Sequence, residues 1–133
     1  MGIKKDVSRR RQRHFVIVDE VFYSRIYVFL GGSLETAQNV FKAKTGLVFK
    51  NSKGEANDIA RTVCLGESKS VLIWFTEVRP RFSDVAHEAF HAIAHILRDC
   101  GIRNLSWQTE EVFTHLQGFY IARIVEQVKC RHQ

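Results

Sequence analysis

This sequence contains little of several residue types, and each shortage excludes a class of protein. Its three cysteines lie far apart and form no Cys-x-x-Cys pair, so neither a disulfide framework nor a cysteine zinc site is expected. No apolar run approaches the length of a membrane span, since even Ile26–Leu30 is followed directly by two glycines. The charged N-terminus lacks the apolar segment of a secretory signal. We therefore expect reduced thiols and a cytoplasmic protein.

The composition is that of one globular domain with an unevenly distributed charge. Of 133 residues, 45% are hydrophobic and 26% are charged, which suffices for one core but not for two domains. Residues 1–14 hold six basic residues and one acidic residue, and so carry +5 of the net charge of +6. We expect a basic arm over residues 1–13 and a single domain over 14–133. Residues 4–13 could contact nucleic acid or an acidic partner, or extend into solvent.

The first half of the chain favours extended structure around one helix. Segments 15–18 and 21–30 are rich in β-branched and aromatic residues, which predicts strands. Ser33 is suited to cap a helix over 34–44, and Gly46 is suited to end it.

The second half predicts a hairpin followed by two helices. Segments 59–65 and 71–77 flank a turn at Gly66 and read as a β-hairpin. Ser83 and Asp84 suggest a capped start for a helix over 85–98, and a last helix is expected over 109–129. The predicted fold is α+β: a small, mostly antiparallel sheet packed with the helix over 85–98, which carries the motif described next, and a C-terminal helix.

The segment His87-Glu88-Ala89-Phe90-His91 is the motif that indicates chemistry. Residues four apart project from the same side of a helix, so His87 and His91 can converge on one metal ion. Glu88 is rotated about 100° from His87, so it would not ligate the metal but could reach a metal-held water. Zinc lowers the pKa of such a water, and a carboxylate can take its proton. The alternative is a pair of ordinary histidines on a helix.

A catalytic zinc site of this kind needs a third protein ligand. Glu111 in the last helix is the favoured candidate, and Glu110 would serve in a different register. Gly118 and Ala122 share the expected face of Glu111 and, being small, would allow the two helices to approach closely. His95 lies too far along the same helix to close on the ion.

His87-Glu88-x-x-His91 followed by Glu111 resembles the gluzincin class of zinc metallopeptidases, and the small size is similar to that of the minigluzincins. Nineteen residues (92–110) separate His91 from Glu111, as is typical of the thermolysin-like branch. The resemblance implies a zincin-like fold, Zn²⁺ held by His87, His91 and Glu111, and Glu88 as the general base. It also implies that strand 71–77 is an edge strand that pairs with a peptide substrate.

The chain departs from that branch where Ser-Asp is replaced by Thr114-His115. His115 could therefore orient a ligand or stabilise the transition state. Tyr120, with Tyr23 and Tyr27, is a further candidate for stabilising the oxyanion.

Two functions are carried forward from the sequence. The first is a small zinc metallopeptidase. The second follows from a resemblance of residues 87–124 to small His-Glu-x-x-His proteins encoded by phages and prophages. It is a non-catalytic accessory protein that binds a host protein or nucleic acid, with a structural or vestigial zinc site.

Overall fold

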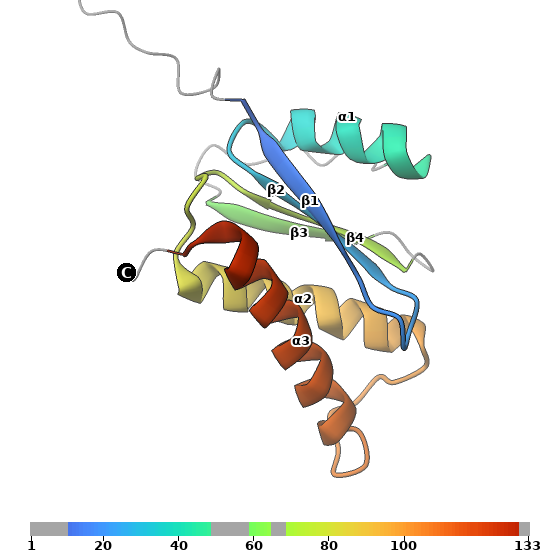
Figure 1. The fold of residues 1–133 in the computed structure, drawn as a ribbon. Coiled ribbons are helices and arrows are strands. Elements are labelled where there is room, and N and C mark those ends of the chain that lie inside the picture. Colours follow the sequence, from blue (N-terminus) through green and yellow to red (C-terminus); the bar gives the residue numbers. More distant parts are fainter. Residues whose placement is uncertain (1–10, 49–58, 65–68, 131–133) are drawn as a thin grey trace, which may run out of the picture.

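The computed structural model of this chain describes residues 11–48, 59–64 and 69–130 (Figure 1). Most of the predicted basic arm, residues 1–10, lies outside them, as does the predicted turn at Gly66. The described elements are β1 (Arg13–Val18), β2 (Arg25–Leu30), α1 (Leu34–Thr45), β3 (Ala60–Cys64), β4 (Ser70–Phe75), α2 (Phe82–Asp99) and α3 (Glu110–Val128).

The strands form one mixed sheet in the order β1-β2-β4-β3. β1 is antiparallel to β2, and β3 is antiparallel to β4 with Ala60 opposite Phe75, which confirms the predicted hairpin. β2 and β4 are parallel, with Ile26 opposite Val71. With the three helices of the described residues beside this sheet, the α+β class is confirmed.

The sheet corrects the prediction that segment 71–77 forms an edge strand. β4 lies inside the sheet, paired with β2 on one side and with β3 on the other. Its residues from Val71 to Phe75 are all buried, because both faces of the strand are covered by helices. A continuous apolar run of this kind is typical of a central strand. In the described part of the chain, the strands at the edges are β1 and β3.

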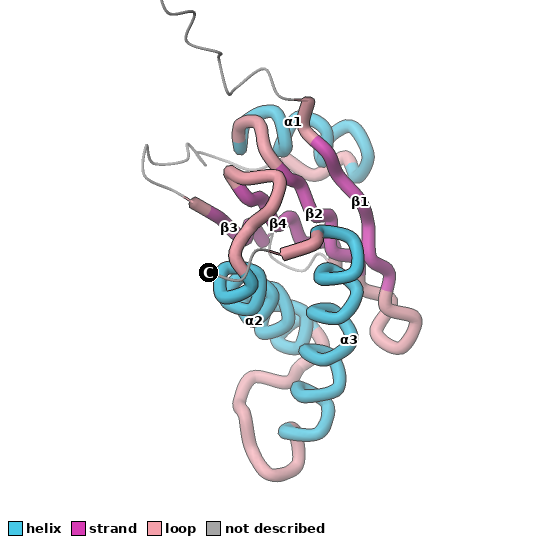
Figure 2. Tube along the Cα trace, turned by 60° about the vertical axis from the view of Figure 1, so that its left-hand side comes forward, coloured by secondary structure: helices cyan, strands magenta, loops and turns pink. Residues whose placement is uncertain are grey.

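Helix α1 covers one face of the sheet (Figures 1 and 2). Ser33 Oγ accepts a hydrogen bond from Thr36 N at 3.0 Å, and Gly46 ends the helix at φ 75°, as predicted. Ala37 and Phe41 of the helix are fully buried. They belong to a small core made with Tyr27, Phe29, Leu34, Leu72 and Trp74.

Helices α2 and α3 cover the opposite face and enclose the larger core (Figure 2). α2 begins at Phe82, earlier than predicted, and Ser83 is not its cap. The carbonyl of Arg81 instead accepts from Asp84 N and Val85 N, so the backbone itself closes the first turn. None of the described helices is both long and apolar enough to cross a membrane.

The packing of α3 differs from the expectation that Gly118 and Ala122 face the neighbouring helix. Both residues are exposed, and a Cβ added at Gly118 would have no atom within 4 Å. α3 instead buries the stripe Leu116, Tyr120, Ile124 and Val128. Large apolar side chains on that stripe gain more from burial than the small residues do, and they set the rotation of the helix.

Candidate metal centre and cleft

His87 and His91 lie one turn apart on the exposed side of α2, and their rings converge. The two Nε2 atoms are 3.1 Å apart, and the ring centroids are separated by 4.7 Å at an interplanar angle of 74°. Two zinc ligands at 2.0–2.1 Å in tetrahedral geometry have their nitrogens about 3.3 Å apart. The pair therefore fits two positions of a zinc site. A hydrogen bond between the rings, one neutral imidazole donating to the other, accounts for the same distance.

Glu88 faces the sheet rather than solvent, and it is only 7% exposed. The Thr62 hydroxyl of β3 donates a hydrogen bond to the Glu88 carboxylate. The Thr62 hydroxyl oxygen also lies 3.0 Å from the backbone carbonyl oxygen of Glu88. Thr62 lies outside the motif, and the sequence alone did not indicate it as part of the site. The alternation of side chains along β3 could have indicated it. Thr62 points to the same side of the strand as Ala60 and Cys64, which pack against the core under the helices.

Glu88 and His91 line one cleft of about 440 Å³ between edge strand β3 and α2. The motif therefore presents its carboxylate and one imidazole to the same space. The full lining is Ala60, Arg61, Thr62 and Cys64 from β3 with Glu88, His91, Ala94, His95 and Arg98 from α2.

The cleft is predominantly basic, because Arg61 and Arg98 line it and Glu88 is the one acidic residue among its lining. Burial raises the pKa of the Cys64 thiol to about 11; Arg98 opposes the rise and Glu88 adds to it. Cys64 is therefore a neutral thiol near pH 7, unsuited to act as a thiolate nucleophile.

The structure does not bring Glu111 or Glu110 to the histidine pair. Both lie exposed in the first turn of α3. Across the described residues, no group of three or more His, Cys, Asp or Glu side chains is placed to hold a metal ion. The cause is the rotation of α3, which buries Leu116 and Tyr120 and leaves Glu111 on the solvent side.

The residues considered for oxyanion stabilisation do not line this cleft. His115 borders a different cavity, between α3 and β1. Tyr120 is fully buried in the core, where its hydroxyl lies 2.6 Å from Ser24 Oγ, and burial raises its pKa. Tyr27 packs under α1, and Tyr23 is 76% exposed in the β1–β2 turn. In this conformation these four side chains are placed for packing or solvent contact rather than for the chemistry of the motif.

Comparison with known proteins identified no relative of this chain. No protein-family model, curated protein or solved structure matches the chain. The geometry of the cleft and of the histidine pair is therefore the basis for inferring a function.

Proposed function

We propose that this chain is a small zinc-dependent hydrolase with a minimal zincin-like architecture, and that its substrate is a peptide. His87 and His91 hold the metal, and Glu88 acts as the general base. The observation that carries the proposal is the 3.1 Å approach of the two Nε2 atoms on the helix that also presents Glu88 and His91 to the cleft under β3.

The protein's contribution to the reaction is to place and hold Glu88. Bound zinc would supply a Lewis acid and lower the pKa of a water molecule. The Glu88 carboxylate takes the proton of the attacking water, and Thr62 restricts the orientation of that carboxylate. Glu111, or alternatively Glu110, remains the third ligand in this proposal. Bringing either carboxylate to the histidines requires the first turn of α3 to move toward α2.

Edge strand β3 replaces segment 71–77 as the place where an extended peptide would pair. Thr76 N donates to Ile59 O, so alternate residues of β3 bond to β4 and the remaining ones turn their backbone groups outward. By this alternation the outward residues are Ala60, Thr62 and Cys64, and each of them also lines the cleft. A peptide added to β3 would therefore lie beside Glu88.

The decisive experiment is Glu88→Gln in zinc-loaded protein, assayed on a mixture of quenched fluorescent peptides. We expect Glu88→Gln to keep its zinc and to lose at least ~100-fold of the hydrolysis rate, because general-base catalysis contributes about that much. Glu35→Gln, an exposed position on α1, is the matched control and should retain full activity. Equal rates for Glu88→Gln and the wild type would refute the assigned role.

A second function is favoured by one observation: among the described residues, no third ligand lies beside the two histidines. In that case the chain is a phage-type accessory protein that binds a host protein or nucleic acid, and its zinc is structural or vestigial. Zinc-loaded wild type would then hydrolyse nothing, and deletion of residues 1–13 would weaken nucleic-acid binding.

A cytoplasmic location belongs to both proposals. The free thiols Cys64, Cys100 and Cys130 suit a reducing compartment.

A further inference from the structure

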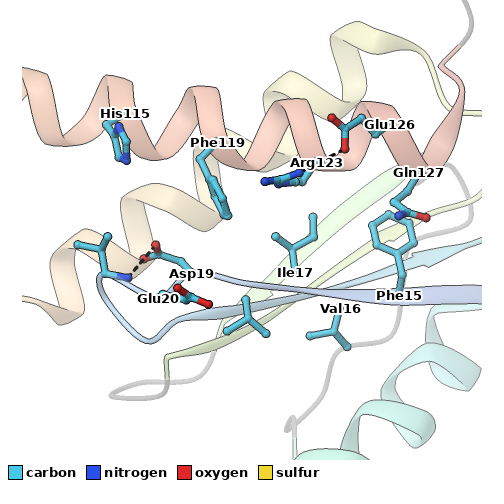
Figure 3. Close-up of a pocket in the computed structure, with 12 residues that line it drawn as sticks. Phe15, Val16, Ile17, Asp19, Glu20, His115, Phe119, Arg123, Glu126 and Gln127 are labelled. Atoms are coloured by element: carbon cyan, nitrogen blue, oxygen red, sulfur yellow. Dashed lines mark hydrogen bonds and ion pairs between the residues drawn. The ribbon is translucent and has the colours of Figure 1, made fainter.

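A second cavity, of about 550 Å³, lies between β1 and α3 and has no part in the proposed hydrolysis (Figure 3). Its floor is the run of residues 15–21, from β1 into the following turn. Its roof is α3, from which Phe119 points toward β1 beside Arg123. The site is therefore distinct from the cleft that holds Glu88, which lies at the opposite edge of the sheet.

The cavity follows the free edge of β1. Four consecutive residues of β1, Phe15 to Val18, line the cavity although Ile17 points toward α3 and Val16 points away from it (Figure 3), so the cavity follows the backbone of the strand and not only the side chains under α3. β1 has β2 on one side, and in the described part of the chain it ends the sheet on the other. The space is thus placed where one more strand would add.

The backbone of β1 offers hydrogen-bonding groups toward this space. Asp19 N donates to Ser24 O, so the odd-numbered residues of β1 bond to β2. By the same alternation His14, Val16 and Val18 turn their N–H and C=O groups outward. Val16 and Val18 are 40% and 46% exposed, and the strand contains neither lysine nor proline, the residues that usually protect an edge.

We propose that a second copy of this chain occupies the cavity, with its β1 antiparallel to the first about a two-fold axis at Val16. In this register each outward residue meets an outward residue: Val16 meets Val16, and His14 meets Val18. On the face toward α3, Phe15 meets Ile17. The strand is therefore complementary to itself, as a two-fold interface requires.

The charges at the two ends of β1 favour a second copy of this strand as the occupant, in the antiparallel orientation. Arg11 precedes β1 and Arg13 is its first residue. Asp19 and the exposed Glu20 follow its last residue. An antiparallel copy sets the basic end of one strand beside the acidic end of the other, whereas a parallel copy would set like charges together. Asp19 is buried and accepts from Val21 N and Phe22 N, so Glu20 carries the exposed charge of that end.

The test is a register-specific cross-link. In a hydrogen-bonded antiparallel pair, opposed Cα atoms are about 5.5 Å apart, within the range that a disulfide spans. Val16→Cys should therefore give a disulfide dimer under mild oxidation. In Val18→Cys the two new thiols would be about 14 Å apart along the paired strands, so this matched variant should not cross-link. The wild type controls for the native cysteines.

Sedimentation equilibrium over micromolar concentrations gives an independent measurement. The wild type should dimerise, Val16→Lys should weaken association at least tenfold because two charges meet at the axis, and Val16→Thr should not. Circular dichroism checks that each variant is folded. A wild type that stays monomeric would overturn the proposal. This would also be the result if a peptide from another protein, rather than a second copy, occupied the edge. Equal cross-linking of Val16→Cys and Val18→Cys would overturn the register.

Discussion

Among the single residues of the candidate site, Glu88 stands out because its side chain is both buried and hydrogen-bonded. It is a carboxylate buried between α2 and β3, and Thr62 donates a hydrogen bond to it. A buried carboxylate that loses such a partner keeps its desolvation cost without compensation. Thr62 therefore matters to stability as well as to the orientation of the proposed base.

Thr62→Val keeps the shape of the side chain and removes its hydroxyl. We expect the free energy of unfolding to fall by about 1–3 kcal/mol, measured by urea denaturation, because Glu88 is left without this donor. Thr62→Ser retains a hydroxyl and should lose less. A Thr62→Val protein as stable as Thr62→Ser would show that the hydrogen bond contributes nothing.

Tyr120 distinguishes a packing role from the predicted catalytic one. Tyr120→Phe removes a buried hydroxyl that bonds to Ser24 and leaves the aromatic ring in the core. The expected cost is about 1 kcal/mol of unfolding free energy, with unchanged zinc content and hydrolysis rate. A large loss of hydrolysis at unchanged stability would restore Tyr120 as a catalytic candidate.

The residues of the site differed in how far the sequence could predict them. The convergence of His87 and His91 follows from helix geometry within one turn, and the structure shows it. The placement of Glu111, His115 and Tyr120 depends on the rotation of α3 against α2. That rotation is set by the sum of many apolar contacts, and the motif itself contains no information about it.

At the scale of the elements, the rotation of α3 gives a prediction with a definite sign. Gly118 is an exposed helical residue with nothing within 4 Å of an added Cβ. Gly118→Ala should therefore raise the free energy of unfolding by about 0.5–1 kcal/mol, since alanine favours a helix. Had Gly118 packed against α2, as predicted, the same change would destabilise the protein.

Gly46→Ala is the matched comparison. This glycine also has nothing within 4 Å, but it ends α1 at φ 75°, a left-handed conformation that costs alanine about 1 kcal/mol. Urea denaturation should thus show opposite signs for the two glycine variants. Equal signs would contradict the assigned conformation of one of them.

The strands show which parts of a fold short segments can predict. The hairpin of β3 and β4 and the helix bounds near Ser33 and Gly46 follow from local turn and cap chemistry, and they are confirmed. The parallel pairing of β2 with β4 joins segments separated by α1 and β3, so nothing local specifies it. The run Val71–Phe75 nonetheless contained a usable signal, because a strand apolar on both faces belongs inside a sheet.

At the scale of the whole molecule, the sheet separates the two proposed sites. α1 lies on one face and α2 with α3 on the other, so the described edges, β3 and β1, are left for partners (Figure 1). β3 borders the cleft with Glu88, and β1 borders the cavity under α3. Pairing at one edge leaves the other accessible.

This separation predicts that dimerisation and hydrolysis are independent. Val16→Lys should abolish most dimer while zinc content and the hydrolysis rate per chain stay within about twofold of the wild type, since sites without shared partners behave additively. A parallel loss of both would indicate that the cleft depends on the second copy.

The central claim is that His87 and His91 hold zinc, and metal analysis tests it most directly. Protein purified without added metal should contain about one zinc per chain by plasma mass spectrometry, and the double change His87→Ala with His91→Ala should lose it while remaining folded. A wild type that contains no metal and takes up none from added zinc would contradict the account.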